Sequence, residues 1–154
     1  MAITARENHW ALRNLLAHCP DGVSARGKGV LKIAEALGVD GYTDLLRHRA
    51  QIRDEHAELS RDLDVLVSLS SPGPAPLWAG DSPGEPLAPW PTGDPVFNAP
   101  GSLRGAPVVN VPLLTVSGMP VGVRVLGRPG GDARVTAGAR WIADTVKTVS
   151  DVMP

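Results

Sequence analysis

Residues 108–126 read VVNVPLLTVSGMPVGVRVL, and this stretch decides the fold. It contains two short runs rich in β-branched residues, Val108–Leu114 and Pro120–Leu126, each of a length typical of a strand. Ser117 and Gly118 lie between the runs, so the stretch predicts a β-hairpin. Because both faces of these strands are apolar, we expect a sheet that is covered on both sides and needs further strands at its edges.

Two further elements flank the hairpin. Residues 64–70 (DVLVSLS) predict a short buried strand. After the hairpin, Gly130-Gly131-Asp132 supplies a turn and a cap, so a helix is expected to follow. Its buried stripe consists of apolar residues at helical spacing, which are Val135, Ala139, Ile142 and Val146.

The amino-terminal third predicts three helices. The first spans Ala5–His18 and ends before the turn sequence at residues 19–22 (CPDG). The second begins after Ser24, which can cap it, and is stopped by Gly38. The third runs from about Tyr42 to Asp62 and has one apolar and one charged face.

A long loop joins the first predicted strand to the hairpin. Residues 71–101 contain nine Pro, five Gly and no Lys or Arg. A loop of this length is uncommon inside a compact domain, and it usually serves a function or is disordered. The element order predicts the α/β fold class and a single partial domain over residues 1–154. Its parts are a helical segment (1–63), strands with the Pro-rich loop (64–127) and a carboxy-terminal helix (132–148).

The composition is that of an ordinary globular chain, with 43% hydrophobic and 20% charged residues. The formal net charge is −1, so no nucleic-acid partner is expected. The apolar runs are too short to cross a bilayer, and the amino terminus lacks the apolar stretch of a signal peptide. The single cysteine, Cys19, fits a reducing compartment. We therefore expect a soluble cytoplasmic protein with no membrane partner.

Three segments carry a resemblance to the amidase-signature enzymes. Residues 92–112 (TGDPVFNAPGSLRGAPVVNVP) resemble the family's late region, which has a TGDP-like turn, Phe-Asn-x-Pro, a short helix, Gly-x-Pro and a strand ending in Pro. Residues 117–128 (SGMPVGVRVLGR) are similar to its Gly-Leu-Pro-Val-Gly-Val-Gln hairpin, and residues 64–76 to its strand and Ala-Pro segment. The family often has Trp where Gly101 stands here. The resemblance covers residues 8–148 and implies the carboxy-terminal part of the family's mixed-sheet α/β/α fold, with the sheet incomplete in this chain.

The resemblance also implies amide hydrolysis by a Ser-Ser-Lys set, with backbone amides holding the oxyanion. In the family those groups belong to the earlier half. These 154 residues contain no Gly-Gly-Ser-Ser-Gly-like segment, and the lysines (Lys28, Lys32 and Lys147) lie on helices or beside a glycine turn. We expect no catalytic residue, no cofactor and no metal in this chain, which alone would be inactive. The implied partners are a separate amino-terminal catalytic half or a second copy, and a small amide substrate. The alternative is a non-catalytic scaffold or a degenerate remnant.

The substrate-binding candidates lie at the end of the Pro-rich loop and are Thr92, Gly93, Asp94, Phe97 and Asn98. Some glutamine-using relatives carry a carboxylate near Asp94 that contacts the amino group of the substrate. Asp94 can instead cap the short helix expected at Asn98–Leu103, or its turn. Trp78 and Trp90 either line the same cleft or anchor the loop.

Four other motifs have plainer explanations. Ser70-Ser71 resembles a catalytic pair, but a strand exit followed by Pro72 favours a turn. Gly22–Lys28 scans as a phosphate loop, but a glycine follows the lysine where Mg²⁺ binding needs Ser or Thr. The histidines, among them His48 and His56, have no metal-ligand spacing and are expected on the solvated surface. Cys19 has no adjacent histidine and is not expected to be a nucleophile.

Overall fold

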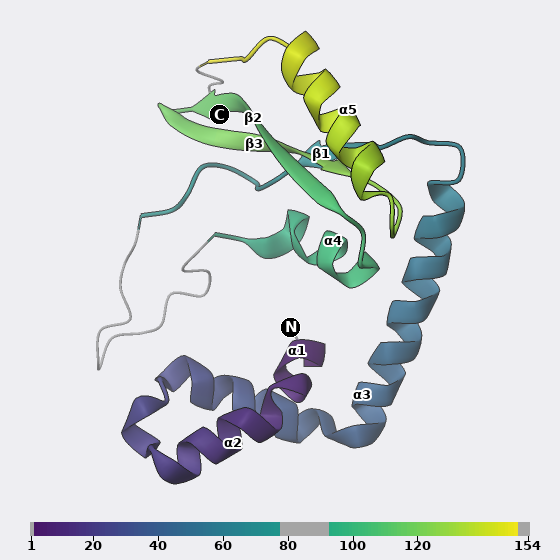
Figure 1. Cartoon of the computed structure of the whole chain (residues 1–154). Coiled ribbons are helices and arrows are strands. Elements are labelled where there is room, and N and C mark those ends of the chain that lie inside the picture. The colour runs from purple at the N-terminus through teal and green to yellow at the C-terminus, as the bar shows by residue number, and fades with distance from the viewer. Residues whose placement is uncertain (1, 78–92, 151–154) are drawn as a thin grey trace. The chain divides into compact units, whose positions relative to one another are not determined.

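The computed structural model describes residues 2–77 and 93–150. The chain divides into two compact units, residues 1–51 and 52–154. A long helix, α3 (Ala25–Leu59), crosses the boundary between them, as Figure 1 shows. That residues 1–154 form a single partial domain therefore stays a prediction. No helix in the described ranges is both long and apolar enough to span a bilayer.

The first unit is helical. It contains α1 (Ala2–Glu7), α2 (His9–His18), the short 3-10 helix η1 (Pro20–Gly22) and the first part of α3. The helix expected over Ala5–His18 therefore begins earlier and is interrupted at Asn8. The predicted cap is confirmed, because the Gly27 N–H donates to the Ser24 hydroxyl over 3.1 Å. Gly38 has φ 65° and ψ −170°, so it breaks α3 where the sequence predicts a stop.

The second unit is built on a three-stranded antiparallel sheet. Its strands are β1 (Leu66–Leu69), β2 (Val108–Val116) and β3 (Met119–Leu126), in the order β1-β3-β2. Ser117 and Gly118 connect β2 to β3 with φ values of 51° and 75°. Two consecutive positive φ angles are what a two-residue hairpin of the I′ type needs, so the predicted hairpin is confirmed.

One face of the sheet is covered by the helix α5 (Asp132–Thr145). The core between them consists of Val111, Leu113, Val125, Val135, Ala139 and Ile142. Val125 and Val135 are almost fully buried, with 0% and 1% of their surface exposed. Gly127 follows β3, and a Cβ placed there would lie 2.1 Å from Cγ2 of Val135. Only glycine therefore allows this approach of the strand to α5.

The opposite face is covered by the 3-10 helix η2 (Pro95–Phe97) and by α4 (Ala99–Arg104). Gly101 of α4 lies against Val108, Arg124 and Leu126, whose side chains point away from α5. Figure 1 shows α5 and α4 on the two sides of the sheet. The predicted α/β fold class is confirmed, and within the described residues the strand pairs are all antiparallel.

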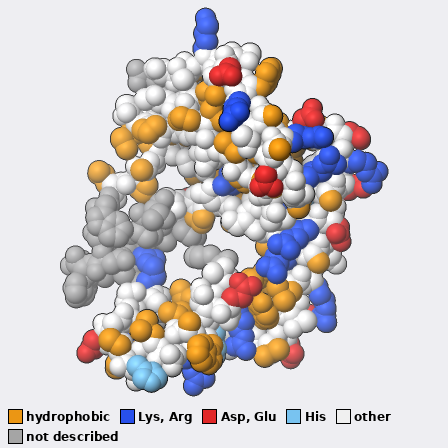
Figure 2. Space-filling view, in the orientation of Figure 1, with side chains coloured by type: hydrophobic (Ala, Val, Ile, Leu, Met, Phe, Trp, Pro, Cys, Tyr) orange, Lys and Arg blue, Asp and Glu red, His pale blue; other side chains and the backbone are white. Residues whose placement is uncertain are grey.

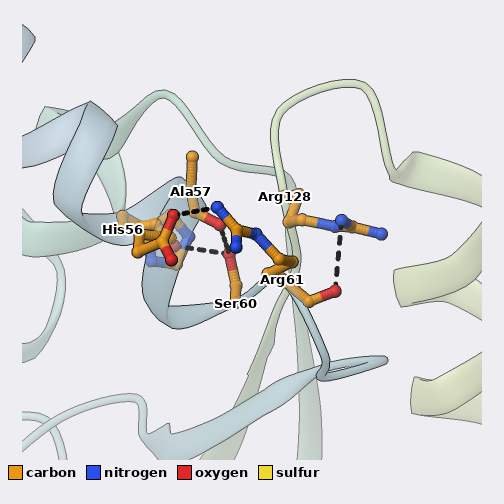
Figure 3. A network of polar contacts seen from close by, with 6 residues as sticks. His56, Ala57, Ser60, Arg61 and Arg128 are labelled. Atoms are coloured by element: carbon orange, nitrogen blue, oxygen red, sulfur yellow. Dashed lines mark hydrogen bonds and ion pairs between the residues drawn. The ribbon is translucent and has the colours of Figure 1, made fainter.

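The end of α3 makes a polar contact with the loop that follows β3. His56 is only 3% exposed, and its Nε2 lies 3.2 Å from the carbonyl oxygen of Gly127. The Ser60 hydroxyl donates to the His56 carbonyl, and Arg128 donates to the Arg61 carbonyl over 3.4 Å (Figure 3). The expectation that His56 lies on the solvated surface is wrong. Its helix face is covered by a loop 71 residues later in the chain, which helical periodicity cannot reveal.

Candidate substrate pocket

A cavity of about 410 Å³ lies where the exit of β1 meets the segment before α4. One wall consists of consecutive residues after the strand, which are Ser71, Pro72, Gly73, Pro74, Ala75 and Pro76. The other wall consists of Gly93, Asp94 and Asn98. Three of the five predicted substrate-binding residues are thus brought together. Thr92, Trp78 and Trp90 lie outside the described residues.

Asp94 has a structural role that uses one of its carboxylate oxygens. It caps η2, because the Val96 N–H donates to Oδ1 over 2.9 Å. Asp94 therefore acts as a cap, as one of the two alternatives predicts. It caps the 3-10 turn η2, which precedes α4, and not α4 itself. The other oxygen, Oδ2, has no hydrogen-bond partner within the described residues, and the side chain is exposed. Capping and ligand binding are therefore compatible at this residue.

Phe97 does not line the cavity. Its side chain is half-buried, and its carbonyl oxygen accepts a hydrogen bond from Nη1 of Arg124. The same guanidinium donates through Nη2 to Oδ1 of Asn98. Arg124 thus ties the segment that forms one pocket wall to β3.

Sequence reasoning missed Arg124. The residue is 6% exposed, and burial lowers the pKa of its guanidinium from the usual value. A buried charge needs hydrogen-bond partners, and Arg124 finds two of them on one short segment, at Phe97 and Asn98. The available signal was an arginine within an apolar strand, Val121–Leu126, where a cation is unexpected.

The serine pair at the exit of β1 is engaged in local hydrogen bonds. The Ser70 hydroxyl donates to the Gly122 carbonyl over 2.8 Å, and the Ser71 hydroxyl donates to the Gly73 carbonyl over 2.6 Å. These bonds are those of a strand end and a following turn, as the simpler interpretation predicts. Within the described ranges, no group of three His, Cys, Asp or Glu side chains could hold a metal ion.

The chain is similar to amidases and to amidotransferases. It is 34% identical over 106 residues to a glutamyl-tRNA(Gln) amidotransferase A subunit from Myxococcus xanthus, a match that covers 65% of this chain and 21% of that protein. A crystal structure of an amidase superposes with a TM-score of 0.76 at 28% identity, covering 91% of this chain and 33% of that one. No family model matches the sequence.

A further solved structure shares the fold. It belongs to a vestigial protein complex described as revealing the evolutionary origins of an s-triazine catabolic enzyme, solved with an inhibitor bound. The TM-score is 0.77 at 24% identity, and the match covers 96% of this chain and 33% of that one. This chain therefore spans about a fifth of the curated relatives and about a third of these structures.

These matches define one class of fold, the α/β fold of amidases and amidotransferase A subunits. Within that class, the chain corresponds to a carboxy-terminal portion of an amidase-signature enzyme. In the structure, residues 64–76 contain β1 and its exit, residues 93–112 contain a pocket wall, α4 and the start of β2, and residues 117–128 contain the turn and β3.

Proposed function

We propose that this chain is a fragment or subunit of an amide hydrolase that acts on carbon–nitrogen bonds. It contributes part of the sheet and a wall of the substrate pocket, and the Ser-Ser-Lys set is supplied by another polypeptide segment. The matches to about a third of two amidase-fold structures support this proposal, as does the lack of a Gly-Gly-Ser-Ser-Gly-like segment in these 154 residues.

The single observation that carries the proposal is the pocket itself. Two segments of the Pro-rich loop, residues 71–76 and 93–98, meet there, and they present a carboxylate and a carboxamide among small and apolar residues. Such a mixture of apolar lining and few polar groups is typical of small-molecule sites. The proposed substrate-binding residues are Thr92, Gly93, Asp94, Phe97 and Asn98.

The proposed partner is a separate amino-terminal catalytic half, or else a second copy of the chain. The matched relative from Myxococcus xanthus is by its name one component of an amidotransferase, which supports a role within an assembly. Strand β1 also pairs with a neighbour on one side only within the described residues, so it could extend into a partner's sheet.

We expect the purified chain to hydrolyse no simple aliphatic or aryl amide. The same chain should support hydrolysis when it is coexpressed with an upstream reading frame that carries a lysine and a Gly-Ser-Ser-Gly-like segment. Ammonia release measures both reactions. Turnover by the chain alone that is abolished in Ser71→Ala would contradict the proposal, and so would a stable complex of the two chains that remains inactive on every amide tested.

Replacing Asp94 should lower activity in that complex. Asp94→Ala removes the free carboxylate oxygen. The expected loss of transition-state stabilisation is about 1–3 kcal/mol, which is measured as a lower kcat/KM. Asp94→Asn is the matched control, because its amide oxygen can still accept from the Val96 N–H and preserve the cap of η2. If Asp94→Ala lowers only the melting temperature and leaves kcat/KM unchanged, Asp94 is a turn residue alone.

A second candidate is a non-catalytic scaffold or a remnant without amide chemistry. It is favoured by the match to a component of a vestigial protein complex, although that description belongs to the other protein. The reading frame next to that of this chain discriminates between the two candidate functions. A frame that encodes a lysine and a Gly-Ser-Ser-Gly-like segment would favour the amide hydrolase. A chain that binds no catalytic half and no amide would support the scaffold.

A further inference from the structure

The two outer edges of the sheet differ in what covers them. The strand order is β1-β3-β2, so β1 and β2 are the outer strands within the described residues. An outer strand presents backbone N–H and C=O groups that can pair with a strand of another chain, and proteins usually cover or interrupt such an edge. The edge of β2 is covered and interrupted, whereas the edge of β1 is not. This difference determines how copies of the chain can associate.

The segment after α5 covers part of the outer edge of β2. It returns to the sheet, as Figure 1 shows, and Val149 forms a parallel bridge with Leu114. The Val149 N–H donates to the Leu113 carbonyl over 2.8 Å, and the Val149 carbonyl accepts from the Thr115 N–H over 3.0 Å. The Leu113 carbonyl and the Thr115 N–H are therefore already paired and are closed to a strand of another chain.

Pro112 interrupts the same edge just before the covered part. The Ser70 N–H donates to the Gly122 carbonyl over 2.9 Å, so Gly122 directs its backbone groups toward β1. Because this direction alternates along an antiparallel strand, Pro112, which lies opposite Gly122 on β2, faces the outer edge. A proline there has no N–H to donate, and the register shifts between Pro112 and Leu114. Both features oppose pairing with another chain.

The outer edge of β1 has neither feature. Ser70 bonds toward β3, so Val67, an odd number of positions away, directs its N–H and C=O groups away from β3. No strand lies on that side within the part of the chain that the structure describes, and β1 contains no proline. Val67 is 56% exposed and lines an apolar groove with Trp141, which is 65% exposed. An open edge beside apolar side chains favours pairing with another strand.

We propose that the chain pairs with a second copy of itself through β1, and that Val149 and Pro112 close the edge of β2 so that this association stops at two chains. A two-fold axis places β1 of one copy antiparallel to β1 of the other, so each open edge satisfies the other. The continuous sheet then ends at a closed β2 on both sides. The proposal concerns the sheet edges and not the pocket. It therefore goes beyond the proposed function and does not depend on amide hydrolysis.

Val149→Pro tests the closure of β2. The proline removes the N–H that bonds to Leu113 and places its ring where the hydrogen was, so the segment should leave β2. Val149→Ala is the matched control, because it keeps the N–H and shortens a side chain that is 50% exposed. Light scattering after size-exclusion chromatography should give twice the chain mass for the wild type and Val149→Ala. Val149→Pro should give larger masses that grow with concentration. Equal masses for the two variants would overturn the proposal, and so would a monomeric wild type.

Val67→Lys distinguishes edge pairing from aggregation of a misfolded chain. The lysine opposes pairing at β1, so Val67→Lys alone should be a monomer with both edges closed. The double variant Val67→Lys/Val149→Pro leaves only β2 open and should stop at two chains, whereas a misfolded chain would not. A monomeric double variant would overturn the closure by Val149. If Val149→Pro abolishes the cooperative melt, deletion of residues 147–154 in the Val67→Lys background replaces it. That protein should also form two-chain assemblies, and a monomer would overturn the proposal.

Discussion

Gly127→Ala is expected to destabilise the second unit by about 3 kcal/mol, near the upper end of what overpacking a core usually costs. The added Cβ would lie 2.1 Å from Cγ2 of Val135, which is far inside van der Waals contact. Val135 is 1% exposed, so its side chain has no free space into which it can move. Thermal melting of a unit of this size should show a drop of about 10 °C or more.

The cause can be separated from a general effect of losing a glycine. Gly73→Ala is the matched control, since an added Cβ there meets no atom within 4 Å, and its melting temperature should be close to that of the wild type. The double variant Gly127→Ala/Val135→Ala removes the atom that clashes. It should be less destabilised than the sum of the two single variants, because the new methyl group fills part of the space that Val135 leaves. Additive losses would show that the contact with Val135 is not the cause.

The isolated chain is expected to self-associate, and Val67→Lys should reduce this strongly. Val67 lies on β1 on the α5 side of the sheet, opposite Val125, yet it is 56% exposed. Together with Val65, Trp141 and Ile142 it lines an apolar groove between β1 and α5. Hydrophobic side chains also reach the surface in the view of Figure 2. An open strand edge beside an apolar groove favours association between chains.

Light scattering after size-exclusion chromatography measures the association. Lysine on an exposed edge strand opposes pairing by charge, and 56% of the Val67 surface is already exposed, so the fold should be retained. Val39→Lys is the matched control, because Val39 is similarly exposed at 62% but lies on α3 in the first unit. A wild-type chain that is a monodisperse monomer with a cooperative melt would show that β1 needs no partner.

The local elements of this fold were predictable from the sequence. The hairpin, the strand at residues 64–70 and the start of α5 at Asp132 follow from turn residues and short-range periodicity, and each lies within a few residues of its predicted place. The break at Asn8 was missed, because the apolar spacing continues across it. The predicted and observed ends of the helices and strands differ most where no glycine or proline marks the end.

The pocket was predictable only in part. Gly93, Asp94 and Asn98 were identified by the resemblance of their segment, whereas the opposite wall at residues 71–76 was not. The contacts that hold the site join residues distant in sequence, such as Arg124 to Asn98 and His56 to Gly127. Local patterns carry no information about such pairs, so burial of His56 and the role of Arg124 needed the three-dimensional structure.

The contact between Gly101 and Arg124 limits the size of the side chain that position 101 can carry. A Cβ at position 101 would lie 3.2 Å from Nη1 of Arg124, so bulk at one position requires a shorter side chain at the other. A large side chain at position 101 would therefore have to displace the Arg124 guanidinium, and with it the hydrogen bonds to the Phe97 carbonyl and to Asn98.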